Sequence, residues 1–223
     1  MPRRLRPTTV PSRCWWSEVT LPLRYVTTNE GKLTEARAYL DAIESESYDY
    51  VEIQADDLEP IAVAGARASH TALGGPVLVD DAGLFIPGLA GFPGPYTAYV
   101  DDTIGVEAVG QLARSTVEEP VEAVFRCVLA YCDGTDAPLR APTHEPADET
   151  GPAVAVFAGE VTGEIVPPRG EGGFGYDPIF SVDGQTFAEL SPAEKNLRSH
   201  RGRALAAFSR WYAAQDTSAS GPG

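Results

Sequence analysis

The chain has 223 residues, with 32 acidic and 17 basic residues, a formal net charge of -15 and 43% hydrophobic residues. This length suits one large domain or two small lobes with a buried core. No apolar run approaches the roughly 20 residues of a membrane span, so a membrane protein is excluded. The acidity would repel a nucleic-acid backbone and disfavours a genome-binding role.

The acidity has two competing explanations. Either it attracts metal ions for function, or it belongs to a surface adapted to high salt, where dissolved ions screen the repulsion between carboxylates. We favour the second, halophilic explanation, because Lys32 and Lys195 are the only lysines in the sequence. Lysines kept in so acidic a chain are candidates for a specific task.

The two ends of the sequence lack the pattern of a folded domain. Residues 1–21 are rich in Arg and Pro, with Trp15 and Trp16 as the strong apolar element, and we expect a flexible arm or an over-long gene start. Because no apolar signal-peptide core follows the basic start, we expect a cytoplasmic protein. We place the folded domain at residues 22–214 and expect residues 215–223 to form a disordered tail.

In chain order, the first half alternates between strand and helix patterns. Strands are predicted at residues 21–28, 48–54 and 76–81, and helices at residues 30–42, 61–73 and 104–115. Gly74 and Gly75 follow the second helix, as glycine commonly follows a helix end. The prolines and glycines of residues 88–99 imply a loop with a fixed backbone path.

The second half predicts a long hairpin. Residues 121–132 and 153–165 both have the pattern of long strands and are expected to pair, while the polar, proline-containing segment 133–152 is an exposed insertion. A short strand over 178–182 and a closing helix over 199–214 complete the pattern. This order predicts an α/β protein with a central mixed sheet flanked by helices, and a site at the strand ends.

The cysteines form neither a metal-ligand set nor a disulfide framework. They are Cys14, Cys127 and Cys132. Cys127 and Cys132 lie in one apolar run, where an odd and an even position point to opposite faces of a strand. We therefore expect both to be buried as small hydrophobic residues.

A first candidate cluster lies where a strand gives way to a helix. Thr27, Asn29 and Lys32 place a hydroxyl, an amide and a full positive charge beside helix N-terminal N–H groups, which together suit an anion. The alternative is a helix cap at Thr28 or Asn29 with Lys32 in solvent.

A second cluster consists of Asp80 and Asp81, with Glu52 on an earlier predicted strand. Carboxylates at a strand end suit a hard ion such as Mg²⁺ that keeps several waters and shares substrate phosphates. Neighbouring strand residues face opposite ways, so we expect only one of the two aspartates to point into a given cleft. The alternative is an ordinary acidic turn.

A third cluster combines a glycine-rich turn at residues 171–178 with a cationic segment at residues 194–201. Glycines allow close approach of the backbone to a ligand, and Phe174 and Tyr176 offer faces to a base. The cationic segment includes Lys195, His200 and Arg201, which suit anionic or carbonyl oxygens. Separately, each part also fits an ordinary turn, core aromatics or a helix start.

Five segments that carry or join these clusters occur in order at residues 26–32 (VTTNEGK), 79–84 (VDDAGL), 91–96 (GFPGPY), 172–178 (GGFGYDP) and 194–201 (EKNLRSHR). Together they resemble the inosine triphosphate pyrophosphatase family, also called noncanonical purine NTP or dITP/XTP pyrophosphatases. The resemblance implies Mg²⁺-dependent hydrolysis of ITP, dITP and XTP to the monophosphate and pyrophosphate, which cleanses the nucleotide pool. It also implies an elongated, two-lobed, homodimeric fold with a cleft between the lobes.

The resemblance further implies roles for single residues. Thr27, Asn29 and Lys32 match the motif that holds the triphosphate. Glu52 matches a metal-ligand glutamate and Asp81 the catalytic aspartate, with Asp80 as a further candidate metal ligand. The base pocket and the final motif, which contacts phosphate and the 6-oxo edge, are matched by Phe174, Tyr176, Asp177, Lys195, Ser199, His200 and Arg201.

Three positions depart from the family pattern. Ala82 stands where a serine often follows the catalytic aspartate, Gly65 where many relatives have a lysine, and residues 97–99 where many have a basic residue. The two missing phosphate cations are absent altogether or replaced by Arg67 or a bound K⁺.

The resulting hypothesis assigns catalysis to Asp81, Lys32 and Lys195. A water aligned by Mg²⁺ attacks the α-phosphorus, and the cations neutralise the leaving pyrophosphate. His200 or Arg201 donates to a 6-oxo group and disfavours the 6-amino group of ATP, whereas the rejection of GTP is unassigned. The alternatives are a pyrophosphatase for other nucleotides and a nucleotide-binding or sensing module without turnover.

Overall fold

The computed structural model describes residues 22–137, 139 and 141–219. The predictions made for residues 1–21, for Cys14 and for residues 220–223 therefore lie outside the described residues. Within the described ranges, no helix is both long and apolar enough to cross a bilayer.

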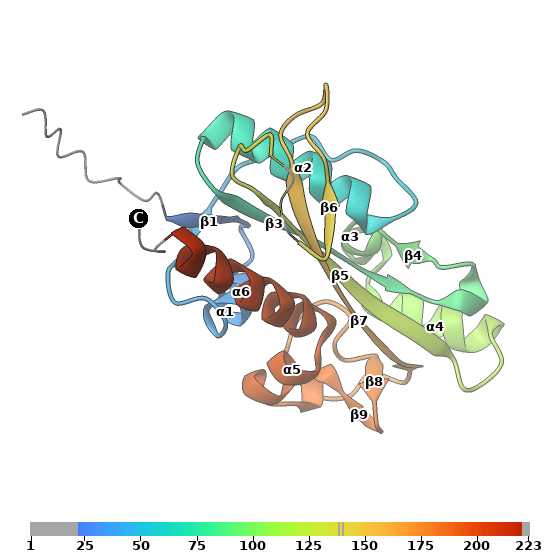
Figure 1. Ribbon diagram of the computed structural model, residues 1–223. Helices are drawn as coiled ribbons and strands as arrows, with labels where there is room; N and C mark the ends of the chain where they lie inside the picture. The colour runs from blue at the N-terminus through green and yellow to red at the C-terminus, as the bar shows by residue number, and fades with distance from the viewer. Residues whose placement is uncertain (1–21, 138, 140, 220–223) are drawn as a thin grey trace, which may run out of the picture.

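One mixed sheet organises the molecule (Figure 1). The strands lie in the order β2-β1-β3-β5-β7-β8-β9, with β4 paired to β3 and β6 paired to β7. Strand β1 is parallel to β2 and β3, and the remaining pairs are antiparallel. The strands are β1 (Leu23–Val26), β2 (Ile43–Glu46), β3 (Val77–Phe85), β4 (Pro93–Gly94), β5 (Glu122–Cys132), β6 (Thr143–Glu145), β7 (Val154–Ile165), β8 (Phe180–Val182) and β9 (Gln185–Thr186).

Helices cover both faces of the sheet. Helices α1 and α6 pack on one face and α2 on the other, while α3 and α4 lie at the far end beside the long β5–β7 pair (Figure 1). The helices are α1 (Glu30–Arg37), α2 (Leu58–Leu73), α3 (Thr97–Ile104), α4 (Val106–Thr116), α5 (Pro192–Arg198) and α6 (His200–Ala219), with short 3-10 turns at Pro87–Leu89 and Phe187–Glu189. The prediction of an α/β protein with a mixed sheet and a long hairpin is confirmed.

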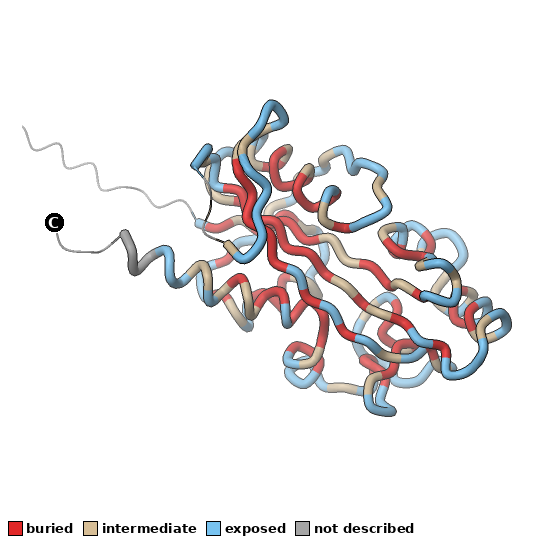
Figure 2. Tube along the Cα trace, turned by 45° about the vertical axis from the view of Figure 1, so that its right-hand side comes forward, coloured by how far each residue is buried: buried red, intermediate tan, exposed pale blue. Residues whose placement is uncertain are grey.

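The apolar core follows the alternation of the strands, and Figure 2 shows the buried residues concentrated in the central strands and the inner sides of the helices. On β5, Cys127 faces the cluster under α6 and Cys132 the cluster under α2, and both are buried. The predicted opposite orientation of the two cysteines is confirmed. A third apolar cluster, around Phe125, Phe180 and Phe187, fills the far end of the sheet.

Several predicted elements need correction. The second strand is Ile43–Glu46, because residues 48–54 find no ladder partner and leave the sheet. Helix α3 was missed: it begins within the predicted loop 88–99 and continues to Ile104, and glycines and prolines mark only its entry. Helix α5 was missed, although Ser191 and Glu194 form a capping box there. Helix α6 continues to Ala219, so the predicted tail at 215–223 begins too early.

Candidate active site

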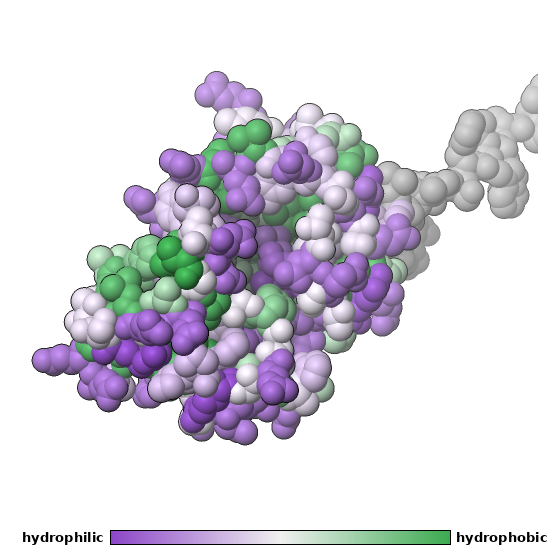
Figure 3. Space-filling view, turned by 180° about the vertical axis from the view of Figure 1, so that it is seen from behind, coloured by the Kyte–Doolittle hydropathy of each residue, from purple (hydrophilic) through white to green (hydrophobic). Residues whose placement is uncertain are grey.

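The candidate site is a cleft over an open stretch of the edge of β3. Strand β1 pairs with β3 only at Val77 and Leu78, and β4 pairs with it only at Leu84 and Phe85. Within the described ranges, the intervening residues, which include Asp80 and Asp81, have no strand partner on that edge. A cleft of about 390 Å³ lies here, and Figure 3 shows a hollow with polar side chains near the middle of the face seen from behind.

Both aspartates line this single cleft, so the expectation that only one would do so is wrong. They do point to opposite faces of β3, since Leu78 and Ala82 belong to the cluster under α6 and Val77 and Val79 to the cluster under α2. Because the strand edge between them is uncovered, the cleft reaches round the edge and meets both side chains. Their surroundings then differ sharply.

Asp80 lies in a buried chain of alternating charges. Its Oδ1 accepts from Lys32 Nζ at 3.0 Å and its Oδ2 from Arg201 Nε at 3.0 Å. The guanidinium of Arg201 also contacts Glu35 at 2.9 Å. Burial acts to raise the pKa of Asp80, but Lys32 and Arg201 outweigh it and hold that pKa well below its usual range. Asp80 is therefore a fixed anion that positions two cations.

The chain of charges continues through Glu35 to Lys195. The Nζ of Lys195 lies 3.0 Å from Glu35 Oε1 and 2.7 Å from Asp177 Oδ2. All of these groups are buried except Lys32, which is partly exposed at the mouth of the cleft. Such a network stabilises the fold only when every member is paired, because the loss of one partner leaves a buried charge without a counter-charge. The arrangement preorganises cations on one wall of the cleft.

Asp81 has the opposite character. Its Oδ1 accepts from the N–H of Ala82 at 2.9 Å, whereas its Oδ2 is buried without a hydrogen-bond partner among the described residues. Burial and the neighbouring charge of Asp80 raise the pKa of Asp81 to about 7. Glu52 lines the same cleft with an exposed carboxylate and adds to this repulsion. Together, Asp81 and Glu52 offer free oxygen ligands to a cation.

The predicted triphosphate motif forms the turn into α1. Asn29 Oδ1 accepts from the N–H groups of Gly31 at 2.9 Å and Lys32 at 3.2 Å, and Thr27 Oγ1 accepts from the N–H of Asn29 at 3.1 Å. The alternative of a helix cap is thus correct for Asn29. Its second part, a lysine in solvent, is not, because Lys32 pairs with Asp80. Asn29 and Lys32 line the cleft.

The aromatic end of the cleft is built around Phe174. Its half-buried ring lies close to Gly31, with the Lys195 ammonium 4.1 Å and the Arg201 guanidinium 5.6 Å from its centroid. Its backbone N–H donates to Asp177 Oδ2 at 2.8 Å, which fixes the glycine-rich turn. The ring therefore joins the phosphate motif to the cationic segment.

The other aromatic and polar residues of these motifs are more deeply packed. Tyr176 is buried, and its hydroxyl donates to the carbonyl of Thr97 at 3.2 Å. His200 stacks on Phe125 with ring centroids 4.5 Å apart, and burial followed by the charges of Arg201 and Lys195 holds its pKa well below its ordinary value. Ser199 is also buried, and its Oγ accepts from the N–H of Gly202 at the start of α6. Tyr176 and His200 line the cleft.

Two acidic residues of the site region were not anticipated. Glu35 joins Lys195 to Arg201, which both line the cleft, and Asp101 of α3 lines the cleft itself. Glu35 was signalled by its place three residues after Lys32, between the apolar residues Leu33 and Ala36 in the sequence. An acidic residue among apolar ones needs a partner when the helix packs. Asp101 had no such signal because α3 itself was missed.

Arg67 does not replace a missing cation in the cleft. Its guanidinium donates to the carbonyls of Pro152 and Pro146 and to Thr150 Oγ1, and it lies 3.3 Å from Asp148. Arg67 thus ties helix α2 to the exposed 133–152 segment. The hypothesis that it contacts phosphate is wrong.

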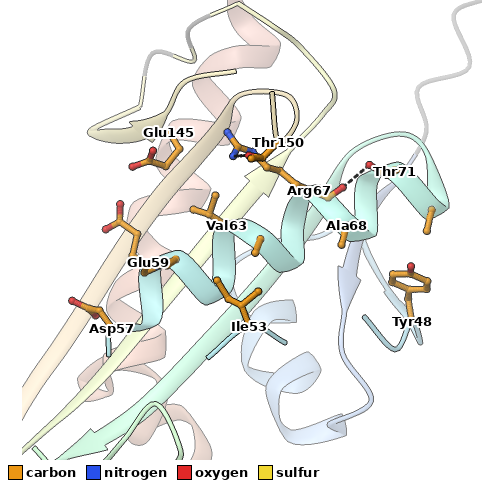
Figure 4. Close-up of a pocket in the computed structure, with 13 residues that line it drawn as sticks. Tyr48, Ile53, Asp57, Glu59, Val63, Arg67, Ala68, Thr71, Glu145 and Thr150 are labelled. Atoms are coloured by element: carbon orange, nitrogen blue, oxygen red, sulfur yellow. Dashed lines mark hydrogen bonds between the residues drawn. The ribbon is translucent and has the colours of Figure 1, made fainter. Parts of the chain in front are cut away.

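A larger hollow of about 970 Å³ lies on the outer side of α2 (Figure 4). Its floor is formed by small and apolar residues such as Val63 and Ala68, with Ile53 and Tyr48 on one side and Thr150 on the other. Its charged lining residues are Asp57, Glu59, Glu145 and Arg67, and Arg67 is already engaged by the 133–152 segment. Several cations converge only in the smaller of these two hollows, so we assign the chemistry to the smaller cleft.

The fold and the cleft define a class of protein, an α/β protein with preorganised cations, free carboxylate oxygens and an aromatic ring at one edge of a mixed sheet. A family model described as the Ham1 family matches residues 23–211, and the chain belongs to this family.

The relatives agree with the resemblance predicted from the motifs. The chain is 43% identical over 196 residues to a dITP/XTP pyrophosphatase of Thermococcus kodakarensis, covering 85% of this chain and 96% of the relative. It is 45% identical over 195 residues to a dITP/XTP pyrophosphatase of Methanopyrus kandleri, covering 84% and 94%. The solved structure of a HAM1 protein from Coxiella burnetii superposes with a TM-score of 0.71 at 30% identity, covering 86% of this chain and 98% of that one.

Proposed function

We propose that the chain hydrolyses purine nucleoside triphosphates with a 6-oxo base, namely ITP, dITP and XTP, to the monophosphate and pyrophosphate. The observation that carries the proposal is that two kinds of group line one cleft. Cations held by buried carboxylates lie beside Asp81, whose Oδ2 has no hydrogen-bond partner among the described residues. The names of the relatives, dITP/XTP pyrophosphatases, support the same substrate class.

The cation wall suits the triphosphate. Lys32 and Lys195 are held by Asp80 and Asp177, so their positions in the cleft are fixed by the protein itself. Preorganised charges of this kind stabilise a developing negative charge without reorganisation during the reaction. Lys32 is the more exposed of the two, which suits contact with the phosphates at the mouth.

Asp81 is the candidate group for the attacking water. Its free Oδ2 and its raised pKa of about 7 mark a carboxylate that gains from a cation or a proton. The residues fit Mg²⁺ because this ion commonly takes one or two carboxylates and completes its shell with waters and phosphates. Asp81 and Glu52 would hold it, whereas both oxygens of Asp80 are engaged by Lys32 and Arg201. When bound, the ion would supply charge neutralisation and a water of lowered pKa.

The described side chains contain no group of three His, Cys, Asp or Glu residues arranged to hold a metal. The substrate phosphates therefore complete the proposed site.

Base selection is assigned to Phe174, His200 and Arg201. Phe174 offers its ring to the purine, and Arg201 keeps guanidinium N–H groups beyond those used by Asp80 and Glu35. A 6-oxo group accepts such donors, while the 6-amino group of ATP would oppose donor to donor and leave buried groups unpaired.

The direct test is the product released from ITP, XTP, GTP and ATP with Mg²⁺ in high KCl. We expect pyrophosphate, and not orthophosphate, from ITP and XTP. The matched controls are Asp81→Asn, which should be inactive, and Asp102→Asn on α3, which removes an exposed carboxylate and should behave as the wild type. Release of orthophosphate, or no release from folded protein, would overturn the proposal.

A further inference from the structure

The ring of Tyr50 lies directly against the backbone of α2 at Gly65. A Cβ atom at position 65 would come within 2.6 Å of the ring and 2.9 Å of the hydroxyl oxygen, closer than side chains pack. Gly65 is buried in the middle of α2, where glycine is less favourable to a helix than alanine. The glycine thus allows a close contact that a larger residue would prevent.

This contact anchors a segment that has few other attachments. Residues 48–54 are neither helix nor strand, and no backbone hydrogen bond joins them to another part of the described chain. Val51 is 90% exposed. Glu52 lines the cleft, whereas Ile53 faces the hollow on the outer side of α2 (Figure 4). The seating of Tyr50 on Gly65 therefore determines where Glu52 lies relative to Asp81.

We propose that Tyr50 is a positioning residue of this site. Its ring, seated on Gly65, holds Glu52 at the cleft beside Asp81. The proposal rests on the proposed function in assigning Glu52 to the metal. It adds a residue outside the cleft lining that fixes the position of a cleft carboxylate.

The ring contact is tested by a double-mutant cycle of Gly65→Ala and Tyr50→Ala, read as thermal unfolding midpoints and as Mn²⁺ affinity without nucleotide. Gly65→Ala in the wild-type background should lower the midpoint by several degrees and weaken Mn²⁺ binding several-fold, because the ring and Glu52 are displaced. In the Tyr50→Ala background, Gly65→Ala should cost nothing, since alanine favours the helix. An equal cost in both backgrounds would overturn the seating.

The conservative variant Tyr50→Phe keeps the ring, with Tyr48→Ala as the matched control on the outer side of α2. Tyr50→Phe should retain the Mn²⁺ affinity and the unfolding midpoint, whereas Tyr50→Ala should weaken Mn²⁺ binding several-fold and Tyr48→Ala should not. Wild-type Mn²⁺ affinity in Tyr50→Ala would overturn the positioning role. If the wild type did not hydrolyse ITP, the proposed function would fail, while the thermal and Mn²⁺ measurements would still decide the seating.

Discussion

At the scale of single residues, Asp80 and Asp81 are adjacent and chemically identical, but their surroundings give them different pKa values and different roles. Asp80 is buried between Lys32 and Arg201, which lower its pKa. The Oδ2 of Asp81 has no hydrogen-bond partner among the described residues, and burial raises the pKa of Asp81 to about 7. The first holds cations in place and the second stays available. Groups whose surroundings push their pKa values apart commonly divide structural and chemical roles in this way.

Replacement of Asp81 separates activity from stability. We expect Asp81→Asn to lower ITP turnover by at least about 100-fold. In metal-free buffer the same change should stabilise the fold by about 1 kcal/mol at pH 8, less than the full pKa shift because the side chain is partly exposed. A raised pKa means that the folded state binds the proton more tightly, so this carboxylate costs stability as pH rises, and the gain should shrink at pH 5. Urea unfolding with a pyrophosphate assay measures both, and wild-type turnover would refute the assignment.

His200 should make the fold sensitive to mild acid. Its pKa is held well below the ordinary value of about 6.5, so the unfolded chain binds a proton that the folded chain does not. The stability linked to His200 is therefore complete above about pH 6.5 and decreases as pH falls below it, by about 1 kcal/mol per pH unit. His200→Phe keeps the stacking surface for Phe125 without a titrating group. Urea unfolding of both proteins at pH 7.5 and 5.5 should show a smaller loss for the variant, and equal losses would contradict this account.

At the scale of elements, the position of α6 on the sheet sets the position of the cations. Arg201 lies in the first turn of α6 and Lys195 in α5 just before it, and the pairings of both with Glu35 connect them to α1. Helix α6 lies close to β7 because Gly159 has no side chain. A Cβ there would meet the carbonyl oxygen of His200 at 2.2 Å and the nitrogen of Ala204 at 2.7 Å.

Replacement of Gly159 by a larger residue should therefore displace α6 and, with it, the site residues His200 and Arg201. Gly159→Ala should destabilise the fold by about 2–3 kcal/mol, since backbone atoms must shift to admit the methyl group. It should also raise KM for ITP, because Arg201 and His200 move with the helix. Urea unfolding and steady-state kinetics measure the two effects. Thr162→Ala, an exposed change on the same strand, is the control and should stay within about 0.5 kcal/mol of the wild type.

At the scale of the whole molecule, the net charge of -15 and the buried ion pairs affect stability in different ways. The buried network has as many carboxylates as cations, so it adds nothing to the net charge, and many of the other carboxylates are exposed. On the β5–β7 hairpin, for example, Glu122 lies directly opposite Glu164, and both are exposed. Repulsion of this kind is screened by salt, while buried pairs are screened much less.

Salt should therefore stabilise this fold. Raising KCl from 0.1 to 2 M should increase the thermal midpoint by about 5 °C, because the surface repulsion falls while the buried pairs persist. Glu164→Gln, which removes one of the opposed charges, should raise the midpoint at low salt and respond less to KCl. Differential scanning calorimetry measures both. A midpoint that falls with salt would contradict the halophilic interpretation.

The sequence by itself determined the alternation of elements, the long β5–β7 pair, the opposite faces of Cys127 and Cys132, and the motifs that signalled the family. These features depend on residue period and turn chemistry, which are local properties. Only the tertiary structure decided that both oxygens of Asp80 pair with cations. It also decided that Glu35 joins Lys195 to Arg201 and that the ring of Tyr50 packs on Gly65. Most of these contacts join residues far apart in the chain, and charge pairing and close packing depend on distances that only the assembled sheet and helices establish.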